Sequence, residues 1–263
     1  MRALVRDPAK AGGLEGAELA RGSFEAEASL ARALEGVTAM LLAGRDSPGY
    51  VAQIERVIAA AEPAHVGHIV ALSAIGACAD SPIALMRDHS EIEQRLRAGA
   101  GSWTFLRPHL YLQNLLRTAE AVRLGGRLSA PMGRLEVPFV DTGDVGAAAG
   151  SVLQSPAEHT GMTYSLTGPA RESYASVAGA LSRLLGRPVA YEAIPQADYR
   201  DRLLASGIPA WRAADLAFIA GAYAPDDLAV TPDLPRLLGR PARSLSAFLD
   251  AHRDVFLGDA AHA

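Results

Sequence analysis

Short apolar runs alternate with longer amphipathic stretches along the first part of the chain. This alternation predicts βα units and a parallel sheet, that is, an α/β fold of the Rossmann type. Because the runs that begin at Val37 and Gly67 are nearly all apolar, we expect helices on both faces of these strands and a place for them near the sheet centre. The expected strands are Arg2 to Val5, Ala17 to Ala20, Val37 to Leu42, Gly67 to Leu72 and Ser102 to Leu106, and the expected helices are Ala28 to Leu34, Tyr50 to Ala61 and Ile83 to Arg97.

The pattern changes after Arg107-Pro108. A Gly-Gly break and a Pro-interrupted stretch from Arg127 to Asp141 follow the next helix, and helices then dominate the chain. We therefore expect a Rossmann domain at 1–167 and a smaller, mostly helical lobe at 168–263, to which 127–138 contributes. The elements expected here are helices at Leu110 to Val122, Asp144 to Leu153 (with Thr142 as N-cap), Tyr174 to Leu185 and Leu245 to Phe256, and a strand at Met162 to Leu166.

The first ten residues, MRALVRDPAK, read as the second strand of a dinucleotide-binding unit. Arg6 and Lys10 then stand where such a strand meets the adenosine ribose, and an arginine there suits a 2′-phosphate. The first strand, the Gly-rich turn and the first helix of that unit are not in the sequence before them, so we expect about 25 to 30 further residues upstream in the natural protein. In their absence, we expect either a sheet split between Arg2 and Val37 or a direct pairing of these two strands, and weak NADPH binding because the pyrophosphate lacks its amides.

Composition excludes several kinds of site. With 49% hydrophobic residues the 263-residue chain can bury a large core, and a net charge of −4 gives no reason to expect nucleic acid as a partner. Lys10 is the only lysine, which excludes a phosphate loop ending in Gly-Lys-Ser/Thr, a Schiff base in a central pocket and a Tyr-x-x-x-Lys pair. Cys78 is the only cysteine, and no apolar run reaches the roughly 18 residues of a membrane span, so we expect a cytoplasmic protein without a membrane partner.

Three other motifs are explained better by a structural role than by a catalytic or ligand-binding role. The GDVGAAAG segment resembles a phosphate turn, but Asp144 would face the anion, and a small-residue helix packed on the sheet explains it better. His65 and His68 have no third ligand nearby in the sequence, so we expect no metal site. Ser73 lacks the Gly-x-Ser-x-Gly elbow of a hydrolase.

His89 is the strongest candidate for a functional side chain from its position. It stands near the start of the helix that follows the strand ending at Leu72-Ser73, so it could point toward a ligand over the strand ends. The alternative is a solvated helical histidine paired with Glu93 four residues on. From the residues alone, this alternative is favoured.

Together, the motifs resemble those of the NmrA-like family of atypical short-chain dehydrogenases. The resemblance covers essentially the whole chain, and the order and spacing of the pieces make it specific. These pieces are VRDPAK, RGSF, EGVTAMLLAG, LSAIGA, DHSEIEQRLRAGAGSWTFLRP with Asn114 following, VPFVDTGDVGAAA, YSLTGP and LLGRP.

The resemblance implies a Rossmann-type NAD(P)-binding domain whose small C-terminal lobe covers the substrate cleft. Arg6 matches the residue facing the 2′-phosphate, which favours NADP(H) over NAD(H). Ser23-Phe24 matches a site where relatives usually carry Asp-Phe beside the adenine, and the missing carboxylate puts one hydrogen bond in doubt. His89 stands where many relatives carry a lysine near the nicotinamide ribose. The resemblance therefore favours a cofactor-side role for His89 over a solvated histidine. Ser73, Ala74 and Pro108 match positions that line the cofactor cleft.

The family includes reductases of quinones and related acceptors as well as regulators that bind the dinucleotide without turnover. As an enzyme, this chain would transfer hydride from NADPH to a small acceptor such as a quinone, and His89 could supply a proton because its unperturbed pKa is near neutrality. As a sensor, it would bind NADP and act through a protein partner. A cofactor-deficient form is the third possibility, given the expected N-terminal loss.

Overall fold

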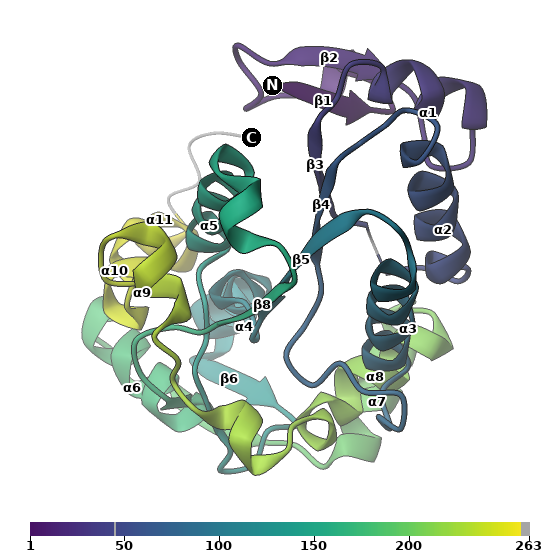
Figure 1. The fold of residues 1–263 in the computed structure, drawn as a ribbon. Helices are drawn as coiled ribbons and strands as arrows, with labels where there is room; N and C mark the ends of the chain where they lie inside the picture. The colour runs from purple at the N-terminus through teal and green to yellow at the C-terminus, as the bar shows by residue number, and fades with distance from the viewer. Residues whose placement is uncertain (45, 259–263) are drawn as a thin grey trace.

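A four-stranded parallel sheet forms the centre of the molecule. The computed structural model describes residues 1–44 and 46–258. The strands are arranged in the order β3 (Ala39–Leu42), β4 (His68–Leu72), β5 (Ser102–Pro108) and β8 (Met162–Leu166). Helices α2 (Tyr50–Ala61) and α3 (Ala84–Ala98) lie on one side of the strands and α5 (Thr142–Gln154) lies on the other (Figure 1). The expected α/β architecture is therefore confirmed.

Alternation along the central strands divides the core into two layers. Ile69 and Ala71 of β4 belong to the cluster that α2 and α3 cover. Val70, between them, belongs to the cluster under α5. In β5, Phe105 faces the first layer and Leu106 the second, and both side chains are fully buried. The period of two in these apolar strands thus fills both faces of the sheet.

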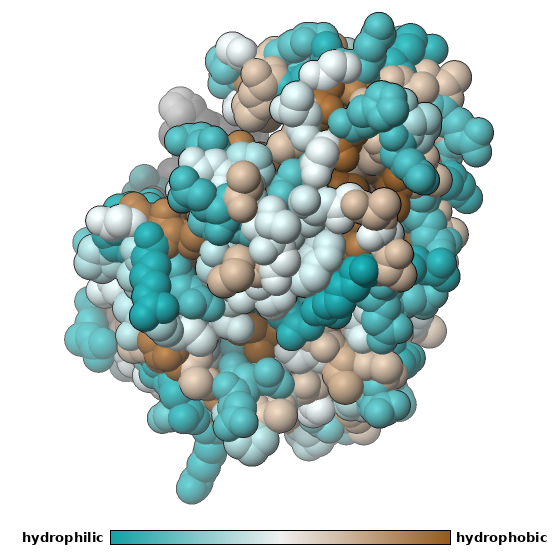
Figure 2. Space-filling view, in the orientation of Figure 1, coloured by the Kyte–Doolittle hydropathy of each residue, from teal (hydrophilic) through white to brown (hydrophobic). Residues whose placement is uncertain are grey.

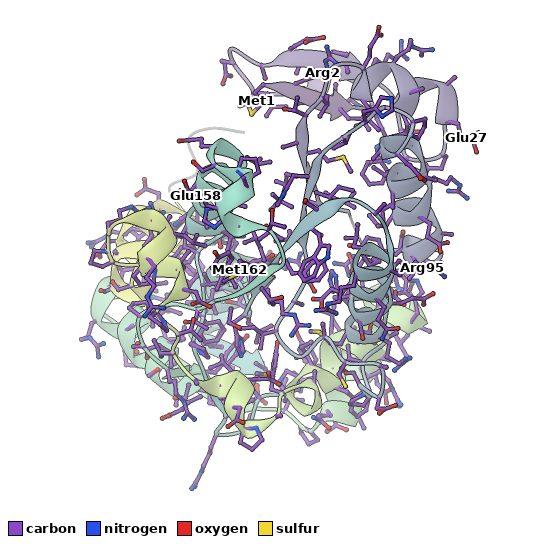
Figure 3. The ribbon with its side chains drawn as sticks, in the orientation of Figure 1. Met1, Arg2, Glu27, Arg95, Glu158 and Met162 are labelled. Carbon is purple, nitrogen blue, oxygen red and sulfur yellow. The ribbon has the colours of Figure 1, made fainter. Side chains whose placement is uncertain are left out.

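The two N-terminal strands form a separate parallel ribbon. Strand β1 (Arg2–Val5) pairs with β2 (Glu18–Arg21), and α1 (Glu27–Leu34) follows. The Arg2 guanidinium, labelled in Figure 3, donates to the carbonyls of Ala33 (3.0 Å) and Glu35 (2.6 Å), which anchors β1 to the carboxyl end of α1. Gly22 ends β2 so close to α1 that a Cβ would lie 2.6 Å from Ser29 Oγ.

The sheet is split, which is the first of the two expected arrangements. Among the described residues, no strand pairs with the outer edge of β3. The expectation that the Val37–Leu42 run lies at the sheet centre is wrong for this sheet, because β4 and β5 occupy its centre. Leu41 is 43% exposed, and Figure 2 shows apolar surface over this part of the molecule, below the β1–β2 ribbon.

The segment after β5 does not form the expected helix from Leu110. Leu110 and Leu112 exchange backbone hydrogen bonds with Val140 (2.9 Å each), which holds residues 110–112 extended. A 3-10 helix at Leu112–Thr118 follows, and α4 (Ala119–Gly125) then ends at Gly126, which has a φ of 60°. Tertiary pairing therefore overrides the helical periodicity here.

Most of the remaining elements form a second, mostly helical part of the structure. Strand β6 (Arg127–Ala130) pairs in parallel with β10 (Ala190–Ala193), and β7 (Glu136–Val137) pairs antiparallel with β9 (Glu172–Ser173). The expected helix from Leu245 to Phe256 is two helices, because the backbone breaks at His252. The other elements are η1 (Pro8–Lys10), η3 (Pro156–His159), α6 (Tyr174–Leu185), α7 (Gln196–Ala205), α8 (Ala210–Phe218), η4 (Ile219–Ala222), η5 (Pro225–Leu228), α9 (Asp233–Leu238), α10 (Leu245–Ala251) and α11 (Arg253–Leu257).

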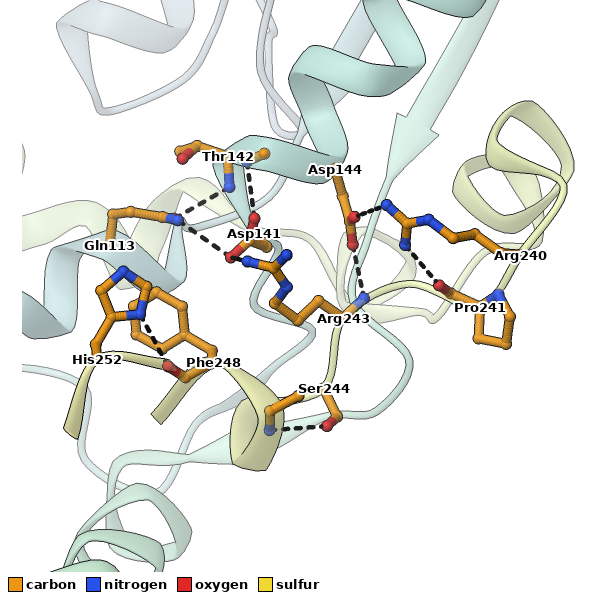
Figure 4. A network of polar contacts seen from close by, with 12 residues as sticks. Gln113, Asp141, Thr142, Asp144, Arg240, Pro241, Arg243, Ser244, Phe248 and His252 are labelled. Atoms are coloured by element: carbon orange, nitrogen blue, oxygen red, sulfur yellow. Dashed lines mark hydrogen bonds and ion pairs between the residues drawn. The ribbon is translucent and has the colours of Figure 1, made fainter. Parts of the chain in front are cut away.

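Two buried aspartates at the start of α5 fasten the C-terminal segment to this helix (Figure 4). Asp141, rather than the expected Thr142, is the N-cap, and its carboxylate accepts from the Gly143 N–H at 2.7 Å. Asp144 is 1% exposed and accepts from Arg240 Nη2 and from the Arg243 N–H, both at 2.6 Å. The GDVGAAAG segment is thus a helix, and its aspartate has a structural partner.

Membrane-spanning helices are not found in the described part of the chain, since none of its helices combines the length and apolar character that a span requires.

Candidate functional site

The carboxyl ends of the sheet strands lie next to one another at one edge. The pairing continues one step beyond the strands, because the Ser73 N–H donates to Leu106 O (2.8 Å), Ile75 N–H to Pro108 O (3.1 Å) and His109 N–H to Leu166 O (3.0 Å). In open α/β sheets, ligands bind in the crevice outside this edge. The structure therefore brings together Ser73, Ala74 and Pro108, which the family resemblance predicted to line the cofactor cleft.

Glu93 of α3 is the polar centre beneath this edge, and sequence reasoning gave it no such role. Its carboxylate is 1% exposed and accepts from Ser73 Oγ (2.6 Å), Arg107 Nε (2.7 Å) and Arg107 Nη2 (2.5 Å). Arg97 donates a further hydrogen bond at 3.0 Å. Burial raises the pKa of Glu93, but these hydrogen bonds and the two guanidinium charges outweigh it and hold the pKa below its ordinary value. The cluster fixes α3 against the exits of β4 and β5.

His89 lies one helical turn before Glu93, and the two are not paired. Glu93 is occupied by Arg107, Ser73 and Arg97, while Nδ1 of His89 is buried without a hydrogen-bond partner among the described residues. The ring meets the buried Tyr50 edge-on, with centroids 5.6 Å apart. The alternative of a histidine paired with Glu93 is therefore wrong, and the His89 side chain is half-buried.

The environment of His89 changes the chemistry available to it. Burial lowers the pKa of His89 to about 4. The ring is then neutral at physiological pH, contrary to the near-neutral pKa that the sequence suggested. It can orient a neighbour by hydrogen bonding, but an imidazolium is not available there as a proton donor.

His109 is a second buried histidine at this edge, and sequence reasoning missed it. It is 3% exposed, directly follows β5, and stacks on Tyr223 of the helical part with ring centroids 4.4 Å apart. Burial lowers the pKa of His109 to about 3 and raises the pKa of Tyr223. Its position beside Pro108, a residue already predicted to line the cleft, is the signal that could have identified it.

The helical part of the chain covers the edge through specific contacts. Asp215 of α8 accepts from the backbone N–H groups of Ala84 and Leu85 at 3.0 Å each, which caps the start of α3. Arg212 of the same helix pairs with Asp46, in the exit turn of β3, at 3.3 Å. A hollow of about 370 Å³ lies at this junction, lined by Pro82, Ile83, Gln196, Ala214, Asp215, Phe218 and Gly221.

The residues predicted for the adenosine side lie on the β1–β2 ribbon. Arg6 and Lys10 are exposed just after β1, and Gly22 N–H donates to Val5 O (2.9 Å), which places the exit of β2 beside them. Ser23 N–H donates to Ser29 Oγ (3.2 Å), and Phe24 packs against the core beneath α2.

Glu25, which the sequence analysis did not consider, belongs to this group. A hydrogen bond from Ser23 lowers the pKa of Glu25, with smaller contributions from its own backbone and from the charges of Arg56 and Arg6. The predicted 2′-phosphate position at Arg6 therefore has a carboxylate near it as well as cations.

A parallel sheet with helices on both faces and a polar cluster at the carboxyl edge define a Rossmann-type α/β protein. The chain belongs to the NmrA-like family, whose model matches residues 1–227.

Relatives of known name are similar over most of their length. The chain is 36% identical over 258 residues to the NAD(P)H azoreductase of Xenophilus azovorans, covering 97% of this chain and 90% of that protein. It is 33% identical over 210 residues to quinone oxidoreductase 2 of Escherichia coli, covering 79% of this chain and 73% of that protein.

Solved structures show the same arrangement. An NADPH-dependent quinone oxidoreductase of Escherichia coli complexed with NADPH superposes with a TM-score of 0.86 at 30% identity, covering 95% of this chain and 89% of that one. The Citrobacter triphenylmethane reductase complexed with NADP(H) gives a TM-score of 0.83 at 26% identity, again covering 95% and 89%.

Proposed function

We propose that this protein is an NADPH-dependent oxidoreductase that transfers hydride to a small acceptor such as a quinone. The observation that carries the proposal is the 36% identity to an NAD(P)H azoreductase across 90% of that protein's length. Two of the similar solved structures are named as a quinone oxidoreductase and a triphenylmethane reductase, so their named substrates are quinones and triphenylmethane compounds. Hydride acceptors of this kind need positioning and exclusion of water more than a strong general acid, which fits a chain without the Tyr-x-x-x-Lys pair.

Two groups of described residues could contact a bound dinucleotide, one at its adenosine end and one at its nicotinamide end. Arg6 and Lys10 would meet the 2′-phosphate, with Ser23 and Phe24 beside the adenine. Ser73, Ala74, His89 and Pro108 would line the nicotinamide side, where the bound cofactor supplies the hydride. His89 would position its neighbours as a neutral ring, because burial holds its pKa at about 4. These roles and the division at 167/168 remain predictions.

Of the parts of the cofactor, the pyrophosphate has the fewest candidate binding groups among the described residues. The exit turn of β1 carries Asp7 and that of β3 carries Asp46, so each places a carboxylate where an anion-binding turn presents amides. We therefore propose that the polypeptide 1–263 binds NADPH only weakly. Dissociation constants in the micromolar range or tighter by calorimetry would contradict this part of the proposal.

The activity is tested by following NADPH oxidation with a panel of quinones and azo dyes, with NADH in parallel. We expect turnover that is faster with NADPH than with NADH. Arg6→Ala should reduce that preference, while Arg32→Ala, an exposed arginine of α1, should not. Binding of the dinucleotide without turnover of any acceptor would overturn the proposal and would be the behaviour expected of a redox sensor.

A further inference from the structure

His109 holds one free hydrogen-bonding atom at the carboxyl edge of the sheet. Its Nδ1 accepts from the Leu110 backbone N–H at 2.7 Å, so in the neutral ring the proton is on Nε2. Nε2 is buried, and no described residue accepts from it. A buried donor without a protein partner is unusual in native proteins, and such a group is explained by strain, by a bound water or ion, or by a functional role.

The backbone holds His109 in one place. Its N–H continues the β5–β8 ladder by donating to Leu166 O at 3.0 Å, and the preceding carbonyl, of Pro108, accepts from Ile75 N–H at 3.1 Å. The backbone at His109 is therefore held between the exits of β4, β5 and β8. This is the edge at which the proposed hydride transfer would take place.

One face of the His109 imidazole packs against the helical part of the chain. The Tyr223 ring stacks on it at an interplanar angle of 29°. Just before Tyr223, the carbonyl of Ala222 approaches the exit of β4 so closely that a Cβ on Gly76 would lie 2.9 Å from it. Because Nε2 is buried, a ligand can reach it only if surrounding side chains move, and Tyr223 is the aromatic side chain that stacks on this ring.

We propose that His109 Nε2–H donates a hydrogen bond to the acceptor heteroatom that becomes negatively charged when hydride is added, such as a quinone oxygen. The inference rests on the proposed reductase function and identifies the acceptor side of that site. A neutral imidazole can stabilise such an oxygen without losing its proton. The two electrons and one proton of the hydride go to the quinone, the resulting monoanion takes its second proton from water, and His109 keeps its own.

The chemistry of the acceptor provides the internal control. Hydride addition to a quinone creates a negative charge, whereas addition to the central carbon of a cationic triphenylmethane dye removes a positive one. A donor to the developing anion should therefore matter for quinones and not for the dye.

The experiment compares His109→Phe, which keeps an aromatic ring for Tyr223 but has no donor, with His109→Gln, which keeps an N–H donor near the Nε2 position. We expect His109→Phe to lower kcat for quinones on the order of 100-fold and to leave dye reduction within about threefold of the wild type. His109→Gln should recover most of the quinone rate. Melting temperatures show whether each variant is folded.

A second readout does not depend on turnover. In protein labelled with ¹⁵N-histidine, addition of a hydroquinone should shift the Nε2 resonance of His109, and that resonance is absent in His109→Phe. Equal losses for quinones and dye, or no loss for either, with an active wild type would overturn this inference and leave the proposed function standing. A wild type without turnover of any acceptor would overturn both.

Discussion

Replacing Glu93 by glutamine should destabilise the protein far more than the same change at an exposed glutamate. The substitution removes a buried charge that accepts hydrogen bonds from Ser73, Arg97 and both nitrogens of the Arg107 fork. Glutamine has nearly the same volume, so packing is conserved and the loss reports the electrostatics. Arg107 would be left at the sheet edge without its carboxylate.

The size of the effect follows from the exposure of the partners. Breaking a fully buried ion pair costs about 3 to 5 kcal/mol. Here the side chains of Arg107 and Arg97 are 26% and 41% exposed, so water recovers part of the loss. We expect about 2 to 3 kcal/mol, or roughly 4 to 12 °C in melting temperature for a protein of this size.

The assay is thermal unfolding of Glu93→Gln beside Glu91→Gln, which lies in the same helix with its side chain half exposed and paired to Arg95 at 2.9 Å. The control should change stability by less than about 0.5 kcal/mol. Because the folded-state pKa of Glu93 is lowered, its contribution is present above the ordinary glutamate pKa and is lost as pH falls through the folded value. The difference between wild type and Glu93→Gln should therefore shrink in acid. Equal melting shifts for the two variants at neutral pH would refute the reasoning.

Two further substitutions test other parts of the structure. One tests how the C-terminal segment is held to α5, and the other tests cofactor preference at the proposed adenosine side. Asp144→Asn should lower the free energy of unfolding by about 1 to 3 kcal/mol and speed tryptic cleavage after Arg243, while the exposed Asp250→Asn should do neither. Unchanged proteolysis would show that the Asp144 contacts do not hold this segment. Glu25→Gln should raise the preference for NADPH over NADH roughly two- to fivefold at low salt, because a carboxylate near Arg6 is neutralised. The control is Glu27→Gln, whose side chain points away from the molecule in Figure 3, and an equal effect of both variants would mean that general surface charge is responsible.

Local hydrophobic periodicity correctly predicted the helices and strands whose tertiary contacts agree with that periodicity. The helices at Tyr50–Ala61 and Tyr174–Leu185 and the strands at Arg2–Val5 and Met162–Leu166 begin and end where the sequence placed them. Each has a clear apolar period and is bounded by turn residues. The expected helix from Leu110 was wrong because Val140, far along the chain, pairs with that segment.

The order of the strands was harder to predict than their existence. An apolar composition showed that the run at Val37 is a strand, but it could not show which neighbours pair with it. In the structure, β3 has one partner, β4, and its other edge is free among the described residues.

The candidate site could be predicted only in outline. Ser73, Ala74 and Pro108 were named through the family resemblance, and their place at strand ends of one parallel sheet is consistent with that expectation. The roles of Glu93 and His109 depend on contacts between distant segments, such as Arg107 with Glu93 and Tyr223 with His109. The loss of basicity at His89 likewise depends on burial, which a single sequence position does not report.

We propose that this edge of the sheet carries out hydride transfer from NADPH. The most direct measurement is anaerobic NADPH oxidation with an excess of a quinone, followed together with formation of the hydroquinone and repeated with NADPH deuterated at the transferred position. We predict one hydroquinone for each NADPH consumed and a slower reaction with the deuterated cofactor. NADPH that is bound but not consumed, with no hydroquinone formed, would contradict the account.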